Sequence, residues 1–159
     1  MKTIRIQTLC APVLVAGLVT LALSLGPRAA SVAASSERHG TLHVTKECSQ
    51  YDGTPGSFCT ITSSNIDAIA VGSKVFYFQG PIAWTGLLDS NVVLDAGNGN
   101  RAMGRCTLDL VTNIALCTFS DGTGELAGFH ARVDGHGDYA NFHWDGIYSF
   151  EAVRRHDNR

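Results

Sequence analysis

Apolar and polar residues alternate with a period of two along most of the chain after residue 40. Successive side chains of a β-strand point to opposite faces, so this alternation predicts strands with one apolar and one polar face. Gly-, Asn- and Asp-rich segments such as "DAGNGN" and "SDGTG" separate the runs and suit tight turns. Only "SNIDAIAVG" has room for a short helical turn. The strands predicted in this way are Thr41–Cys48, Phe58–Ser64, Ser73–Gln79, Asn91–Ala96, Arg101–Leu110, Ile114–Ser120, Glu125–Asp134 and Ala140–Phe150.

Eight strands joined mostly by short turns predict an antiparallel meander. Closing the meander into a barrel removes its two exposed edges, whereas a β-sandwich is the alternative arrangement. The interior of an eight-stranded barrel is either filled by side chains or holds one small ligand. The predicted fold class is therefore all-β, an eight-stranded antiparallel β-barrel. Whether its interior is filled or hollow decides whether the protein can bind a ligand there.

Residues 1–34 are predicted to be a cleaved secretory signal peptide and linker. Lys2 and Arg5 precede an apolar run, Ala11–Gly26, and the small residues that follow suit signal peptidase. A membrane anchor is the alternative, but this run is shorter than the roughly 20 residues that span a bilayer. The remaining chain is predicted to be one domain, residues 35–152, with a polar tail, residues 153–159. The expected location is secreted or periplasmic.

Cleavage also changes the charge of the protein. It removes Lys2, Arg5 and Arg28 from the 12 basic residues and none of the 14 acidic ones, which leaves a net charge of −5. An acidic protein of this kind has no basic patch for nucleic acid, and none for an anionic membrane once the signal peptide is gone.

Four cysteines remain after cleavage: Cys48, Cys59, Cys106 and Cys117. An even number in an exported chain indicates disulfides, and four cysteines allow three pairings. The pairs Cys48–Cys59 and Cys106–Cys117 are favoured because each flanks a predicted turn. A four-cysteine zinc site is the alternative, but such sites need closely spaced Cys-x-x-Cys pairs.

Three segments together resemble bacterial secreted proteins of the allene oxide cyclase barrel-like class. They are Cys59–Gly80, Leu87–Leu110 and Leu116–Phe150, and the piece "GTGELAGFHA" is also similar to a Gly-rich segment of plant dirigent proteins. The resemblance implies an eight-stranded barrel with a central cavity for an apolar, often oxygenated molecule. It further implies that a reactive substrate can be held there for cyclisation, and that a homo-oligomer is compatible with the class.

Polar side chains share one face of the last two predicted strands. His143 and Asp145 are neighbours on that face of the last strand, and His130 and Arg132 occupy the corresponding face of the strand before it. If this face lines the barrel, a histidine becomes a candidate general acid or base that Asp145 orients. If it faces water, these four candidate catalytic residues are ordinary surface groups.

The opposite faces carry the candidate ligand-binding residues Phe129, Trp144 and Tyr148, to which Tyr77 and Trp84 are added from the segment "FYFQGPIAWTG". Small barrels are usually filled by large apolar groups, so the aromatic face is the favoured interior. Trp84 either caps a cavity, covers the end of the core or packs against another subunit.

Neither a metal nor a cofactor is predicted. His136 and the two carboxylates of "DGHGD" could join His130, His143 and Asp145 around a metal, but no spacing matches a known metal motif. The functions left open are binding of a small apolar molecule, cyclisation or isomerisation of such a molecule, and a purely structural or interaction role.

Overall fold

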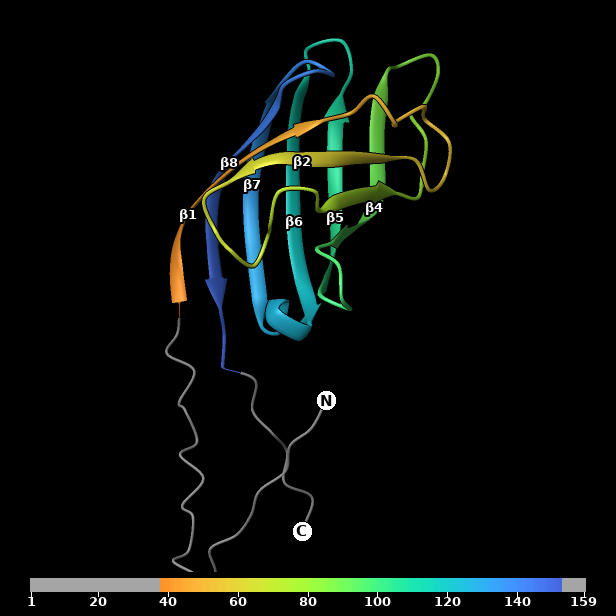
Figure 1. Cartoon of the computed structure of the whole chain (residues 1–159). Coiled ribbons are helices and arrows are strands. Elements are labelled where there is room, and N and C mark those ends of the chain that lie inside the picture. Colours follow the sequence, from red (N-terminus) through yellow and green to blue (C-terminus); the bar gives the residue numbers. More distant parts are fainter. Residues whose placement is uncertain (1–37, 153–159) are drawn as a thin grey trace, which may run out of the picture. The chain divides into compact units, whose positions relative to one another are not determined.

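Eight antiparallel strands form a closed barrel in the computed structural model, which describes residues 38–152 (Figure 1). Each strand pairs with the next in sequence, and β8 pairs with β1 to close the barrel. The predicted signal peptide and polar tail lie outside the described residues. The elements are β1 (Arg38–Glu47), β2 (Phe58–Ser64), β3 (Lys74–Tyr77), β4 (Leu87–Asp95), β5 (Arg101–Asp109), β6 (Ile114–Thr123), η1 (Gly124–Leu126), β7 (Phe129–Gly137) and β8 (Phe142–Phe150).

The predicted barrel is confirmed, and several strand boundaries and one connection differ from the sequence pattern. β4 begins at Leu87 rather than at Asn91, and β7 begins at Phe129 rather than at Glu125. Glu125 belongs instead to η1, a single 3₁₀ turn between Gly124 and Gly128, which have φ angles of +60° and +74°. Glycine adopts such positive φ angles without steric strain, so these two residues allow the chain to turn over the end of the barrel. The segment of residues 65–73 holds turns and no helix.

The barrel core comes from the apolar face of each strand. On β1 and β4 the side chains of Leu42, Val44, Leu88 and Leu94 are buried, while their neighbours in sequence are more exposed. On β8 it is the aromatic face, with Trp144 1% exposed, that points inward. The period-two pattern therefore reflects real inside and outside faces.

Two disulfides join neighbouring strands. Cys48, which follows β1, is bonded to Cys59 of β2, and Cys106 of β5 is bonded to Cys117, its direct partner in β6. All four residues are buried. Both favoured pairings are confirmed.

The two ends of the barrel differ. In the β1–β8 ladder, Arg38 pairs with Phe150 at one end and Lys46 with Phe142 at the other. Near the Phe150 end the interior is filled by large apolar side chains, which are those of Ile69, Leu126, Phe129 and Phe150. At the Lys46 end the β1–β2, β5–β6 and β7–β8 connections surround a cavity. Between residues 38 and 152, no helix is long and apolar enough to cross a membrane.

Candidate functional site

The cavity extends from the barrel interior to the rim of loops at the Lys46 end. Both disulfides contribute to its walls. Lys46, which is 2% exposed, lies at the inner end of the cavity, and Tyr139, which is 54% exposed, lies on its rim. Its volume, taken as the space open to the centre of a water molecule, is about 30 Å³. A water needs roughly 10–15 Å³ on this measure, so the cavity has room for about two waters or one small functional group.

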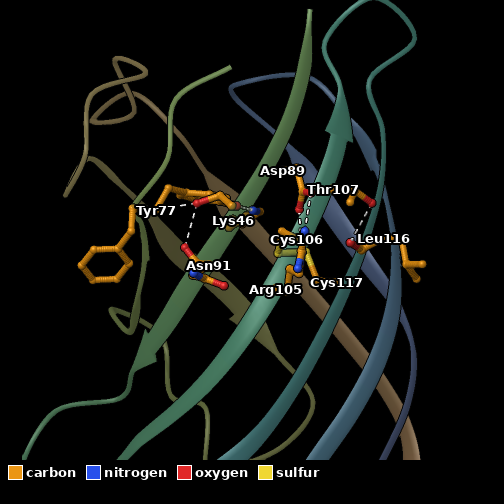
Figure 2. The surroundings of a disulfide bond; sticks show 11 residues. Lys46, Tyr77, Asp89, Asn91, Arg105, Cys106, Thr107, Leu116 and Cys117 are labelled. Carbon is orange, nitrogen blue, oxygen red and sulfur yellow. Dashed lines mark hydrogen bonds and ion pairs between the residues drawn. A yellow bond between two sulfur atoms is a disulfide. The ribbon is translucent and has the colours of Figure 1, made fainter. Parts of the chain in front are cut away.

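Lys46 is the charged residue inside this cavity. It occupies an inward-facing position of β1, in line with Leu42 and Val44, next to a register shift in the β1–β2 pairing between Thr45 and Lys46. Bulges of this kind often redirect a side chain near functional sites. The Lys46 amine donates a hydrogen bond to the Tyr77 hydroxyl at 2.5 Å. Figure 2 draws both residues among the surroundings of the Cys106–Cys117 disulfide.

Aromatic rings surround the Lys46 amine in place of a carboxylate. The nitrogen lies 4.4 Å from the ring centroid of Trp144, 5.0 Å from that of Phe142 and 5.1 Å from that of Tyr77. None of the ion pairs found within residues 38–152 involves Lys46. The acidic residue that lines the same cavity, Asp138, is exposed, and its carboxylate accepts hydrogen bonds from the backbone of the β7–β8 turn.

Burial lowers the pKa of Lys46 from its usual value of 10.5 to about 7. The cause is desolvation, because an ammonium ion loses its hydration in an apolar interior. The Trp144 and Phe142 rings attract the charged form and act against this change, but each such contact is worth only about 0.5–2 kcal/mol. Near neutral pH the amine is therefore available in both its neutral and its protonated form.

Two tyrosines accompany the amine. The Tyr51 and Tyr77 rings meet edge to face with centroids 5.0 Å apart. Burial raises the pKa of Tyr77 well above its usual value and, with smaller contributions from Tyr139 and Asp52, raises the pKa of Tyr51 to about 12. Both hydroxyls therefore keep their protons at neutral pH and can donate them in hydrogen bonds.

Two further polar atoms of the cavity walls lack a hydrogen-bond partner within residues 38–152. The Tyr51 hydroxyl and the Trp144 indole N–H are buried and form no hydrogen bond with the described part of the chain. Buried polar groups are normally satisfied, and an unsatisfied one costs about 1–3 kcal/mol. Together with the Lys46 amine, they make this end of the barrel suited to a molecule that brings hydrogen-bond acceptors.

The candidate ligand-binding residues are divided between the two ends of the barrel. Tyr77 and Trp144 line the cavity. Phe129 is fully buried at the filled end, and the half-buried Tyr148 packs beside it with ring centroids 6.5 Å apart. Trp84 is 87% exposed in the β3–β4 connection and is not among the residues that line the cavity, so it does not cap it.

The candidate catalytic residues lie on the outer face of the barrel. Because β8 directs Trp144 inward, His143 and Asp145 face outward, and their counterparts on β7, His130 and Arg132, do the same. The interpretation in which this polar face lines the interior is therefore wrong. The physical reason is burial: the aromatic face removes far more apolar surface from water than the polar face would.

These outer residues form a surface cluster that differs from the predicted one. Asp145 lies 2.6 Å from His43 Nδ1 and 3.8 Å from His136 Nε2, and His143 Nδ1 lies 3.2 Å from the Thr45 hydroxyl. The β1–β8 and β7–β8 registers bring these residues together.

His130 and Arg132 stay apart from that surface cluster. The β7–β8 register pairs Arg132 with Ile147, and His130 lies 3.8 Å from Glu151. Within residues 38–152, no three His, Cys, Asp or Glu side chains are placed to hold a metal ion.

Sequence reasoning missed Lys46, although a signal was present. In "LHVTKEC" the alternation places Leu42, Val44, Lys46 and Cys48 on one face, so a lysine occupies a position that the pattern reserves for an apolar residue. Lysine is almost never fully buried without a partner. A charged residue at an apolar position of a predicted barrel strand was thus the available indication.

No family model matches the chain, and no curated protein or solved structure is significantly similar to it. The resemblance to the allene oxide cyclase barrel-like class therefore stays a prediction that rests on the three sequence segments. The closed eight-stranded barrel agrees with the fold that the resemblance implies. What the protein does has to be argued from its own residues.

Proposed function

We propose that the protein binds a small, mainly apolar molecule carrying a hydrogen-bond-accepting oxygen at the Lys46 end of the barrel. The observation that carries this proposal is the Lys46 amine, which is buried in an aromatic cavity with the Tyr77 hydroxyl as its hydrogen-bond partner. A buried amine of this kind destabilises the fold, since desolvating it is costly. A ligand oxygen would accept a hydrogen bond from this amine. Ligand binding would therefore explain why a lysine that lowers the stability of the fold is present at this position.

The size of the cavity limits how the molecule binds. About 30 Å³ admits the polar end of a ligand, but not a whole drug-sized molecule. The apolar remainder would lie along the upper wall and rim, where Leu108, Leu110 and Tyr139 provide an apolar surface. We therefore expect slender molecules with a terminal oxygen to bind better than branched or bulky ones.

An NMR titration with hexanol tests this proposal. Backbone amide signals of Tyr51, Tyr77 and Phe142 should shift in a saturable manner. Lys46→Met should weaken binding about tenfold, the effect of losing one buried hydrogen bond. His143→Ala is the matched control, because this side chain lies on the outside of β8, between the cavity residues Phe142 and Trp144, and it should bind as the wild type does.

Two results would reject the proposal. One is the absence of saturable shifts at the Lys46 end for hexanol, and the other is binding that His143→Ala weakens and Lys46→Met does not. With no binding at all, the structural or interaction role becomes the better description.

Isomerisation is the second candidate function, and the pairing of Lys46 with Tyr77 favours it. An amine with a pKa of about 7 beside a protonated phenol is a suitable base and acid for moving a proton along a substrate. The resemblance to allene oxide cyclase-like proteins points the same way. The test of this candidate function is the conversion of a β,γ-unsaturated ketone to its conjugated isomer, measured by ultraviolet absorbance. Lys46→Met and Tyr77→Phe should each abolish the conversion, whereas His143→Ala should retain it.

Export is proposed alongside binding. The two disulfides fit an oxidising compartment, and they add to the predicted signal peptide. The intact mass of the protein recovered from the periplasm or medium should correspond to a chain that begins near Ser35. A mass that retains Met1 would contradict cleavage, and free thiols in that protein would contradict export to an oxidising compartment.

A further inference from the structure

Lys46 and Lys74 are the two lysines between residues 38 and 152, and they differ sharply in environment. Lys74 is exposed on β3, with its amine 4.4 Å from the Phe58 ring centroid. Lys46 is buried in the cavity, with its amine hydrogen-bonded to Tyr77. The chain thus holds one buried amine with access to a cavity and one surface amine for comparison.

We propose that Lys46 is a nucleophile that binds an aldehyde or ketone covalently, as an imine, in the cavity. This inference rests on the proposed binding function and names its ligand class. An uncharged carbonyl compound is favoured over a carboxylate because it brings no second charge into an apolar site, where a buried ion pair often costs more than it gains. A carbonyl carbon also gives the amine something to react with, whereas an alcohol or a carboxylate gives only a hydrogen-bond acceptor.

The arrangement of Lys46 and Tyr77 suits this addition. The Tyr77 hydroxyl accepts a hydrogen bond from the Lys46 amine, so its own O–H is free to donate to an oxygen that enters the cavity. The carbonyl oxygen then lies near the hydroxyl while the carbonyl carbon lies near the amine. Tyr77 keeps its proton because burial raises its pKa, and desolvation keeps part of the Lys46 population neutral.

The step balances without any further reactant. The lone pair of neutral Lys46 Nζ forms a bond to the carbonyl carbon, and the carbonyl π electrons move to oxygen, which takes a proton from Tyr77. Nitrogen returns a proton to the tyrosinate, and the carbinolamine forms. Loss of the hydroxyl group with the remaining N–H proton gives the imine and one water. The cavity reaches the rim at Tyr139, so the water has a route out.

Trapping with a reductant tests the proposal on the exported protein with its disulfides intact. The protein is incubated with hexanal and sodium cyanoborohydride at neutral pH, which converts an imine to a stable secondary amine and leaves disulfides unreduced. Peptide mapping by mass spectrometry then compares Lys46, Lys74 and the α-amino group. We expect modification of Lys46 at a rate at least about tenfold above that of Lys74, because burial lowers the pKa of Lys46 to about 7 and the cavity places a proton donor, Tyr77, beside this amine.

Two variants separate the chemistry from simple access. Tyr77→Phe retains the lysine and should reduce the Lys46 rate at least about tenfold, the usual contribution of a positioned proton donor being larger still. Lys46→Arg should abolish the adduct at this position and leave Lys74 labelling unchanged. Circular dichroism spectra of both variants verify that the barrel is folded.

Hexanol distinguishes failure of this inference from failure of the proposed function. If hexanol binds at the cavity and hexanal gives no Lys46 adduct above the Lys74 rate, the imine is overturned and the binding function stands. If hexanol does not bind and no selective adduct forms, both are overturned. A selective Lys46 adduct that Tyr77→Phe leaves unchanged removes Tyr77 from the reaction and supports the nucleophile alone.

Discussion

The buried lysine makes a quantitative prediction about stability. Replacing Lys46 by Met keeps the length of the side chain and removes its charge. The pKa of Lys46 is about 7 in the folded protein against 10.5 in water. At 1.36 kcal/mol per pKa unit, the charged amine therefore lowers the free energy of unfolding by about 5 kcal/mol at acidic pH.

The sign of the pH dependence follows from which state binds the proton. Between pH 7 and pH 10.5 the unfolded chain keeps the lysine proton and the folded protein has released it, so stability rises with pH in this interval. Integration between pH 7 and pH 9 gives a gain of about 2 kcal/mol for the wild type from this group. Lys46→Met lacks that gain, so its stability advantage should shrink by the same amount.

Urea unfolding of wild type, Lys46→Met and Lys74→Met at pH 7, 8 and 9 measures the effect. The other titratable residues that line the cavity are Tyr51, Tyr77, Asp138 and Tyr139, and all are present in each protein. The series stops at pH 9 because the raised pKa of Tyr51 and Tyr77 makes stability fall once tyrosines of the unfolded chain ionise, near pH 10.

A constant difference between wild type and Lys46→Met across this range would refute the reasoning. It would mean that the amine keeps its proton in the folded state, stabilised by the surrounding rings and by Tyr77. Lys74→Met retains Lys46 and should therefore follow the wild-type pH profile. A pH profile of Lys74→Met that flattens like that of Lys46→Met would equally contradict the assignment.

Three further substitutions test other parts of the fold. Replacing Cys106 and Cys117 together by Ala should lower the free energy of unfolding by about 3 kcal/mol in non-reducing urea melts, since the bridge closes a short loop; a loss below about 1 kcal/mol would contradict this. Ser90→Ala should lower the free energy of unfolding by about 1–3 kcal/mol in the same assay, because the buried hydroxyl accepts hydrogen bonds from two backbone N–H groups and donates one to a backbone carbonyl. An unchanged unfolding midpoint would contradict this expectation. Trp84→Ala should change stability by no more than about 0.5 kcal/mol because the side chain is 87% exposed; a loss near 2 kcal/mol would reveal packing of this side chain, for instance against another subunit.

Much of the barrel could be predicted because strand formation leaves a direct mark on the sequence. Alternation identifies the strands, Gly- and Asn-rich segments identify the turns, and cysteines flanking a turn can bond across adjacent strands. The ends of the strands were harder to predict from the sequence. Glu125 continues the alternation before β7 but lies in η1. The path of η1 depends on glycine φ angles, which the alternation of apolar and polar residues does not encode.

The candidate site was harder to predict, for two physical reasons. Alternation separates the faces of β8 but does not say which one is inside, so His143 and Asp145 remained candidates until the closed barrel placed Trp144 in the core. The importance of Lys46 depends on partners from other strands, namely Tyr77 on β3 and Phe142 on β8. Such contacts follow from strand register and barrel closure, which local sequence does not specify.

The pairing of Arg38 with Phe150 also determines how the barrel responds to force. These residues are the first of β1 and the last of β8, and they lie side by side at the end remote from the cavity. A load applied through both chain ends pulls the two strands apart at that point, so their hydrogen bonds break one after another instead of sharing the load. Opening would begin at the seam between β1 and β8 and reach the pair formed by Lys46 and Phe142 last.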